Sequence, residues 1–410
     1  MRRRGRERVA RGRSLVGERY TVDVGPVAHG GHFVARHEGR VIFVRHTLPG
    51  ERAVVEVTEG DEGSKFLRAD AIAVESASAD RVTPPCPFSG PGRCGGCDCQ
   101  HVALPAQREL KAAVVREQLS RLAKLDVTVV VEAVPGDREG LDWRTRVQFA
   151  IGPGGRPGLR KHRSREIEYV DRCLIAHPDL PDVLGRTWPG TDSVEAIVSA
   201  TGEQLRVLSS AGGVDLDGPD VLHEKVSGRG FEVSGSGFWQ VHPSAAEVLT
   251  SAVLAALDAQ PGERALDLYS GVGLFSAFVA ERVGPTGSVV AVESDPVAVD
   301  DAARNLAGLP QVTLVVDRVE RALERGSVGD RADLVVLDPP RVGAKRDVVS
   351  AVAALGPRAV AYVACDPGAL ARDVHIFAEH GYRLESLRAF DIFPMTHHVE
   401  CVALLVPTGA

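Results

Sequence analysis

From about Pro243 to its end, the sequence alternates between short apolar strands and helical segments. Seven strands can be read there: ERALDLYS, SVVAVES, VTLVVD, ADLVVLD, AVAYVAC, YRLESLRAFDIF and VECVALLVP. This alternation is typical of a parallel α/β sheet covered by helices. The last two strands have the spacing of a meander rather than of a crossover. We therefore predict a seven-stranded, Rossmann-like domain over residues 241–410.

Three other regions precede this domain. Residues 15–76 contain short, Val-rich strands separated by glycines, which predicts a small closed barrel of the OB-like type. Residues 77–240 begin with a Pro- and Cys-rich stretch, continue with an amphipathic helix from about Pro105 to Leu125, and then become β-rich. Residues 1–14 lack apolar periodicity and are predicted to form a disordered basic arm. The expected fold is therefore multidomain, which agrees with a length of 410 residues.

Composition excludes several classes of protein. Charged residues make up 25% and hydrophobic residues 44% of the chain, which is unlike collagen-like, wholly disordered or coiled-coil proteins. No apolar run approaches the roughly 18 to 20 residues that span a bilayer, and no apolar segment follows the Arg-rich start. We therefore expect a cytoplasmic protein without a membrane partner. Its seven cysteines then indicate thiol or metal chemistry rather than disulfides.

Positive charge is concentrated in two segments although the net charge is −7. Residues 1–19 hold eight arginines and two glutamates, and the stretch from Arg144 to Arg165 holds seven basic residues and no acid. Local fields of one sign attract polyanions even when the total charge is negative. Charge alone allows a nucleic-acid surface and a merely solvated tail and hairpin equally well.

The stretch from Leu266 to Gly273, LDLYSGVG, predicts an apolar strand that runs into a glycine-rich turn and a helix. Glu293 closes the second strand about 20 residues later, where a carboxylate can bind ribose hydroxyls. Leu274 and Phe275 replace the small residues that a pyrophosphate requires. A cofactor with ribose and adenine but no phosphate, such as S-adenosylmethionine, therefore fits better than NAD. Asp317, which ends the third strand, is expected to reach the adenine.

Two further strand ends carry reactive groups. Asp338 ends the fourth strand and Cys365 the fifth, so both should face the same crevice as the glycine-rich turn. Asp366 and Pro367 predict an N-cap and a first helical residue, and a helix N-terminus beside Cys365 favours its thiolate. Glu400 opens the last strand, where its carboxylate can act as general base beside the thiolate.

Five of these segments together resemble the RNA uracil-C5 methyltransferase family. They are AYVACDP with Cys365, FPMTHHVEC with Glu400, LDPPR with Asp338, GSGFWQVHP with Gln240 and LDLYSGVG with Tyr269. The first 75 or so residues resemble the TRAM domain of that family, a small RNA-binding barrel. The resemblance covers nearly the whole chain.

The resemblance implies a role for each matching residue. Cys365 would add to C6 of a uracil in RNA as the nucleophile, and Glu400 would remove the C5 proton. S-adenosylmethionine would lie among Gln240, Tyr269, Glu293 and Asp317. Asp338 would lie between cofactor and target base and is counted with the cofactor-binding residues. Leu274 departs from the family, in which a polar residue is expected. Ribosomal RNA is favoured over transfer RNA as the partner, and no obligate protein partner is evident.

Four cysteines form a candidate metal site. Cys86, Cys94 and Cys97 lie within twelve residues, and Cys173 is available from the middle region. Their spacing alone suits either zinc or an iron–sulfur cluster. The resemblance favours a structural [4Fe–4S] cluster, with a longer loop before Cys94 than the family has. Cys99 and Cys401 are left outside this set.

Two alternatives remain open at this point. An enzyme that methylates the amino group of a base would use an acid-Pro-Pro-aromatic motif, but Arg341 occupies the aromatic position and such an enzyme does not need Cys365. A non-catalytic RNA-binding assembly factor would keep the barrel and the metal site. It would not need the thiol and the carboxylate.

Overall fold

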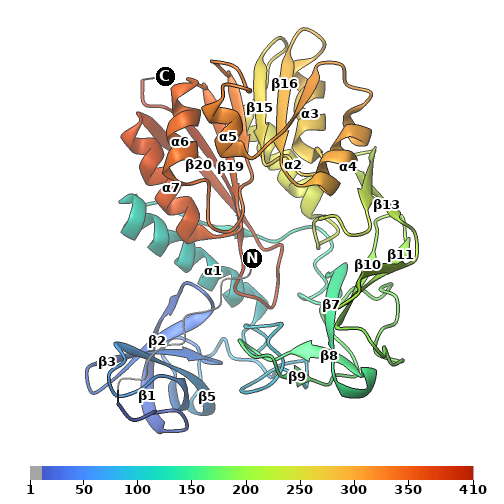
Figure 1. The fold of residues 1–410 in the computed structure, drawn as a ribbon. Coiled ribbons are helices and arrows are strands. Elements are labelled where there is room, and N and C mark those ends of the chain that lie inside the picture. Colours follow the sequence, from blue (N-terminus) through green and yellow to red (C-terminus); the bar gives the residue numbers. More distant parts are fainter. Residues whose placement is uncertain (1–11, 410) are drawn as a thin grey trace. The chain divides into compact units, whose positions relative to one another are not determined.

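The computed structural model describes residues 12–409, which group into two compact units (Figure 1). Unit 1 comprises residues 12–110, 160–168 and 395–397, and unit 2 comprises residues 111–159, 169–394 and 398–409. Most of the predicted basic arm, residues 1–11, lies outside the described residues. The sequence predicted four consecutive regions, whereas the two units are each made of several segments of the chain. The predicted domain boundaries therefore stay a prediction.

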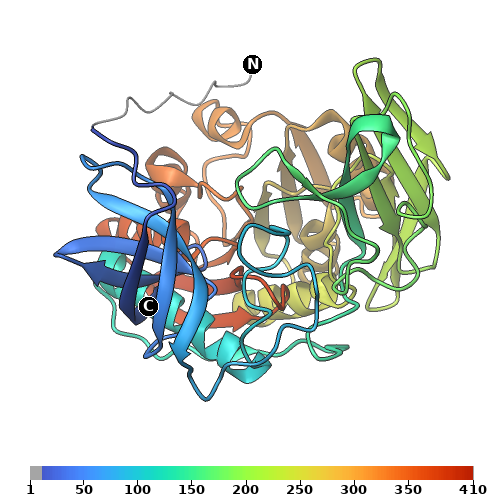
Figure 2. The same ribbon diagram turned by 90° about the horizontal axis from the view of Figure 1, so that it is seen from below.

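Unit 1 is built around a five-stranded closed barrel, drawn in blue in Figure 2. The strands are β1 (Arg19–Ala28), β2 (His32–His37), β3 (Arg40–Arg45), β4 (Arg52–Glu59) and β5 (Phe66–Ser76), paired in the order β1-β2-β3-β5-β4. Alternating side chains such as Val22, Val24, Ile42 and Val44 fill its interior, as the pleat of short strands dictates. The predicted barrel is confirmed.

Backbone hydrogen bonds add distant segments to unit 1. The Gly95 N–H donates to the Arg160 carbonyl over 3.0 Å. The Met395 carbonyl accepts from the N–H groups of Asp98, at 2.9 Å, and Cys99, at 3.0 Å. The hairpin at 160–168 and the segment 395–397 therefore belong to the same unit as the Cys-rich loop.

Unit 2 contains five strands of an antiparallel sheet, in the order β12-β11-β10-β7-β8, apart from Arg160 at the end of β8, which is counted with unit 1. Its strands are β7 (Arg146–Ile151), β8 (Pro157–Arg160), β10 (Ser193–Val198), β11 (Gln204–Ser210) and β12 (Gly213–Asp217). A separate hairpin consists of β13 (Val221–Val226) and β14 (Arg229–Ser234), whereas the two-residue β9 (Ile167–Glu168) lies in unit 1. Val147, Phe149, Val194 and Trp188 pack together in the core of this sheet.

The C-terminal part of unit 2 is an eight-stranded sheet in the order β17-β16-β15-β18-β19-β21-β20-β6. Seven strands match the predicted ones: β15 (Arg264–Leu268), β16 (Ser288–Glu293), β17 (Val312–Val316), β18 (Leu334–Leu337), β19 (Ala359–Ala364), β20 (Tyr382–Phe390) and β21 (Glu400–Pro407). The first five are parallel, and β21 is antiparallel to both of its neighbours. The eighth strand, β6 (Val131–Glu132), was missed because two residues show no alternation.

Helices cover both faces of this sheet. Helices α2 (Ala245–Leu257), α3 (Leu274–Val283) and α4 (Pro296–Leu306) share one core with strand residues such as Ala265. Helices α5 (Val319–Glu324), α6 (Lys345–Ala354) and α7 (Pro367–Glu379) share the other core with residues such as Leu266 and with the end of α1 (Leu104–Gln118). Helix α1 continues as a π-helical turn over Leu119–Ala123, close to the predicted end at Leu125. Among residues 12–409, no helix has the length and apolarity needed to cross a membrane.

Candidate active site

The register of the parallel strands aligns the predicted site residues along one edge of the sheet. Leu268 pairs with both Val292 and Leu337, and Leu337 pairs with Tyr362. The carboxyl ends of these strands therefore lie together, as expected for an open α/β sheet. The predicted residues at or directly beyond these ends are Tyr269, Glu293, Asp317, Asp338 and Cys365.

Cys365 and Glu400 meet across two antiparallel strands. Ala364 of β19 pairs with Cys401 of β21, so the next step along both chains brings Cys365 opposite Glu400. Side chains at opposed positions of an antiparallel pair lie on the same face of the sheet. Glu400 is buried and Cys365 is half-buried. The structure thus brings together the predicted nucleophile and the predicted base.

The environment of Cys365 disfavours its thiolate. Burial raises the pKa of the thiol to about 12, the carboxyl groups of Glu400 and Asp338 add to the rise, and the Arg341 guanidinium opposes it. The predicted N-cap exists, because Asp366 accepts from the Ala369 N–H at 2.7 Å. Burial and the carboxyl groups outweigh Arg341, so the thiol keeps its proton in the free protein. The expected contribution of the helix end to the thiolate stays a prediction.

Two carboxyl groups beside the thiol also hold their protons tightly. Burial, with a smaller contribution from Asp338, raises the pKa of Glu400 well above its ordinary value. Burial and the nearby Asp267 raise the pKa of Asp338 to about 7. Arg341 acts on both Glu400 and Cys365 in the opposite direction. Arg341 was not expected to act at this site, although its place in LDPPR, three residues after Asp338, was a signal.

The turn that follows Arg341 is fixed by a buried carboxylate. Asp373 of α7 accepts from the Ala344 N–H at 2.7 Å and from the Lys345 N–H at 3.2 Å. The Tyr362 hydroxyl, on β19, donates to the same oxygen at 2.5 Å. The segment after Arg341 is therefore attached to the strand and the helix that flank Cys365.

The glycine-rich turn has the backbone conformation that was expected from its sequence. Gly271 and Gly273 have positive φ angles of 53° and 86°. A Cβ at Gly273 would lie 2.9 Å from Leu306, whereas one at Gly271 would meet no atom within 4 Å. Glu293 accepts from the Gly271 N–H at 2.9 Å. The predicted ribose-binding carboxylate thus lies against the turn, with open space beside Gly271.

Two buried polar atoms near this turn fit a hydrogen-bonding ligand. Within the described chain, Asp267 Oδ1 and Ser270 Oγ are buried and have no hydrogen-bond partner, while the other Asp267 oxygen accepts from Ser276 at 2.5 Å. A buried polar group without a partner costs about 1–3 kcal/mol. A nucleoside cofactor in this turn would offer such partners, so the residues fit S-adenosylmethionine. The sequence analysis gave neither residue a role.

The other expected cofactor residues lie at the rim of this region. Asp317 is half-buried, accepts from the Arg318 N–H at 2.8 Å and pairs with Arg325 at 3.1 Å. Leu274 is buried in the core, which agrees with its apolar character. Gln240 is half-buried in the loop between β14 and α2. Its association with the strand ends stays a prediction.

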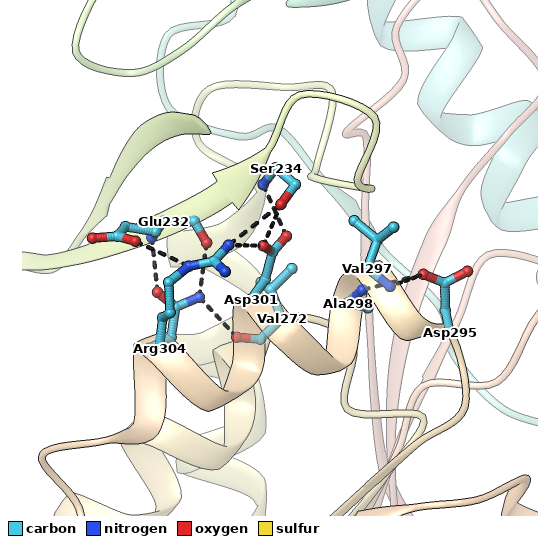
Figure 3. A network of polar contacts seen from close by, with 9 residues as sticks. Glu232, Ser234, Val272, Asp295, Val297, Ala298, Asp301 and Arg304 are labelled. Atoms are coloured by element: carbon cyan, nitrogen blue, oxygen red, sulfur yellow. Dashed lines mark hydrogen bonds and ion pairs between the residues drawn. The ribbon is translucent and has the colours of Figure 1, made fainter. Parts of the chain in front are cut away.

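A polar network around the buried Asp301 fixes the start of the Gln240 loop (Figure 3). Asp301 of α4 accepts from the backbone N–H of Ser234 at 2.9 Å and from its hydroxyl at 2.6 Å, and it pairs with Arg304. Arg304 also pairs with Glu232 at 3.1 Å. Beyond Ser234, the Gly237 carbonyl accepts from Arg146 at 2.5 Å. The loop is thus attached at two points before it reaches Gln240.

The predicted iron–sulfur site is not supported by the geometry. Across residues 12–409, no three His, Cys, Asp or Glu side chains converge in a way that could hold a metal ion. Gln100 instead donates to the Cys97 sulfur at 3.3 Å and accepts from the Cys86 N–H at 3.1 Å.

Three family models match parts of the chain. Residues 13–72 match the TRAM domain, and residues 329–407 match the tRNA (uracil-5-)-methyltransferase family. Residues 239–320 match the protein-L-isoaspartate(D-aspartate) O-methyltransferase family, which covers the glycine-rich turn. The matched segments thus include the barrel, the Cys365–Glu400 pair and the region that was expected to bind the cofactor.

Relatives that match nearly the whole chain are also RNA methyltransferases by name. An "uncharacterized RNA methyltransferase" of Streptomyces coelicolor is 50% identical, over 97% of this chain and 94% of the relative. One from Bifidobacterium longum is 38% identical, over 91% and 93%. The crystal structure of Pyrococcus abyssi tRNA (uracil-54, C5)-methyltransferase with S-adenosyl-L-homocysteine has the same fold, with a TM-score of 0.70 and 22% identity over 94% of this chain and 100% of that one. The chain described here belongs to the family of RNA methyltransferases.

Proposed function

We propose that this RNA methyltransferase transfers a methyl group to C5 of a uridine. The observation that carries the proposal is the opposition of Cys365 and Glu400 at the sheet edge that also bears the glycine-rich turn. Methylation of an amino group would need neither side chain. The match of residues 329–407 to the uracil-5-methyltransferase family supports the same reaction.

In the proposed reaction, Cys365 Sγ loses its proton and bonds to C6 of the uracil, which gives C5 the character of an enolate carbon. S-adenosylmethionine, when bound, supplies an electrophilic methyl group for C5. Glu400 then takes the C5 proton, and the bond from Sγ to C6 breaks. The sulfur leaves as a thiolate and recovers its proton from the group that accepted it, and the base keeps one methyl group. The C5 proton remains on Glu400, which must be ionised when it takes that proton.

The proton on Cys365 needs an acceptor because the thiol pKa is about 12. A general base is most effective when its pKa lies near the working pH. Asp338, with a pKa of about 7, has this property and acts electrostatically on Cys365. We therefore assign Asp338 to the reaction centre as the acceptor of the thiol proton, in addition to its expected place beside the cofactor.

S-adenosylmethionine would be held by the glycine-rich turn together with Tyr269, Glu293, Asp317 and Gln240. The unpartnered atoms of Asp267 and Ser270 and the open space at Gly271 support this assignment. The Pyrococcus enzyme, which shares the fold, was solved with S-adenosyl-L-homocysteine.

The RNA substrate is proposed only as a uridine-containing RNA. The resemblance favoured ribosomal RNA, whereas the family model and the Pyrococcus enzyme are both named for transfer RNA. The [4Fe–4S] cluster stays a prediction of the resemblance, and no step of the reaction depends on it. Iron and sulfide analysis of anaerobically purified protein tests it directly.

The experiment that tests the proposed function uses the whole protein, S-adenosylmethionine with a labelled methyl group, and separately purified ribosomal and transfer RNA. Nucleoside analysis should find the label in 5-methyluridine from one of the two RNA pools. Label in N-methylated nucleosides, or no transfer to either pool when the RNA comes from cells that lack this protein, would contradict the proposal.

A further inference from the structure

Unit 1 contains a cavity of about 590 Å³. This volume lies within the usual range of sites for small ligands, roughly 300–1,000 Å³. Barrel residues, the 160–168 hairpin and one residue of the Cys-rich loop, Gly92, form its wall. The lining residues are His32, Arg45, Thr58, Glu59, Arg68, Ala69, Asp70, Gly92, Lys161, His162, Arg163, Ser164 and Glu166. None of these residues belongs to the site at the sheet edge.

Two histidines give the cavity flat, uncharged surfaces. His32 is buried, and its ring lies edge-to-face with the His162 ring at 6.3 Å between centroids. Burial, reinforced by nearby arginines, lowers the pKa of both imidazoles to about 4. At neutral pH each ring therefore carries no charge and offers one hydrogen-bond donor, one acceptor and an aromatic face.

Three cations, Arg68, Lys161 and Arg163, surround these rings, and we call them the rim cations. Arg68 and Arg163 share a single oxygen of Glu59, at 3.2 and 3.9 Å. Lys161 pairs with Glu166 at 3.1 Å. These pairs are partly or fully exposed. Surface pairs contribute only about 0–1 kcal/mol, so a phosphate can replace a carboxylate at little cost.

Uncharged histidine rings beside basic side chains match a nucleotide that is not stacked in a helix. Proteins bind single-stranded RNA by stacking its bases on rings and by placing cations along its phosphates. We propose that this cavity binds one unstacked nucleotide of the RNA substrate, with its base against the two histidine rings and its phosphate among the rim cations. The proposal rests on the proposed function in one respect, which is that the ligand belongs to RNA.

Arg45 also lines the cavity, and its contacts connect the cavity to a segment outside the barrel. It is buried and donates to Asp98 Oδ1 at 3.2 Å, and Asp98 Oδ2 is bonded to His397 Nδ1 at 2.6 Å. His397 stands three residues before Glu400 in the sequence. The nucleotide site is thus connected within unit 1 to the segment that leads into the proposed base.

The test uses the whole protein and a fluorescein-labelled, 15-nucleotide single-stranded RNA of mixed sequence. Arg163→Ala should weaken binding by about fivefold or more, because it removes one phosphate partner. Arg165→Ala is the matched control, since it removes the same charge from the same hairpin but does not line the cavity. If the two substitutions weakened RNA binding equally, binding would depend only on the general positive charge of the surface, and the proposal would be overturned.

A second pair of variants tests the position of the base. His162→Ala should weaken RNA binding about five- to tenfold, whereas His162→Phe, which keeps an aromatic face, should bind within about twofold of the unchanged protein. Equal loss in both variants, with melting temperatures unchanged, would exclude stacking. Displacement of the RNA by inorganic phosphate or by polyglutamate at matched charge would identify a general anion site and also contradict the proposal.

Failure of this inference can be told from failure of the proposed function. If the unchanged protein makes 5-methyluridine and the two arginine variants bind alike, only the cavity assignment fails. If Arg163→Ala selectively loses RNA binding and no 5-methyluridine is made, only the proposed reaction fails.

Discussion

Glu400 lies across from Cys365, because Ala364 pairs with Cys401 and one further step along both chains reaches these two residues. The two side chains are far apart in the sequence, and the antiparallel insertion of β21 beside β19 brings them together. A thiol and a carboxyl group in this relation can act in sequence on neighbouring atoms of one ring. The first predictions concern this pair.

Cys365→Ala should abolish methyl transfer, whereas Glu400→Gln should accumulate a covalent adduct between protein and RNA. The glutamine cannot take the C5 proton, so the bond between sulfur and C6 persists; loss of a general base typically costs about 10²- to 10⁴-fold in rate. Denaturing gels with labelled RNA would show the adduct. Cys401→Ala, which removes the neighbouring buried thiol, should leave transfer intact, and an adduct in Cys365→Ala would refute the assignment.

Alkylation of Cys365 by iodoacetamide should be slow in the free protein. A pKa of about 12 instead of 9.0 lowers the thiolate fraction at pH 8 by about a thousandfold. The rate, followed by peptide mass spectrometry, should still be rising at pH 10. Glu400→Gln should raise it at alkaline pH, where Glu400 is ionised, because the charge of the carboxylate contributes to the high pKa of the thiol. A rate that levels off near pH 7 would contradict this view of the site.

Asp338→Asn should stabilise the protein at alkaline but not at acidic pH. The pKa of Asp338 is raised from 3.8 to about 7, so the folded state holds a proton that the unfolded state releases. Stability is therefore lost as the pH rises from about 4 to 7, and the loss is complete above pH 7. The asparagine removes this loss, and its melting temperature should exceed that of the unchanged protein at pH 8 by a few °C, at ~2–4 °C per kcal/mol. Asp330→Asn, at an exposed position, should show no such pH-dependent gain.

Asp301→Asn should loosen the loop that carries Gln240. It weakens the acceptor of two hydrogen bonds from Ser234 and the ion pair with Arg304, and loss of a buried acceptor costs about 1–3 kcal/mol. We expect a lower melting temperature and a KM for S-adenosylmethionine that rises more than kcat falls. Asp300→Asn, an exposed neighbour on the same helix, is the matched control. Equal kinetic effects of the two changes would exclude a positioning role for Asp301.

Much of the fold could be read from local patterns. The barrel and the seven long strands have the period of two or the apolar runs that burial imposes. Strand β6 could not be read, because a two-residue strand depends on its pairing with Ala389 and Phe390 rather than on its own sequence. The end of α1 was also misplaced slightly, because a π-helical turn keeps the apolar pattern of a helix.

The site was less accessible from the sequence. Asp338 and Cys365 could be placed at one edge of the sheet, because the carboxyl ends of parallel strands lie together whatever the side chains are. The high pKa of Cys365 could not be foreseen, because burial and the approach of Glu400 are tertiary properties. The unpartnered atoms of Asp267 and Ser270 are likewise visible only after the surrounding side chains have been placed.

The short segment Met395–His397 belongs to unit 1, although the residues on both sides of it belong to unit 2. Its backbone and side chains are held by Asp98 and Gln107, which lie almost 300 residues earlier in the chain. The two units are therefore not interchangeable modules. A chimera that joined this C-terminal portion to a foreign barrel would lose the contacts that hold residues 395–397, the segment just before the strand that carries Glu400. The N-terminal region and this segment would therefore have to be inherited and altered together.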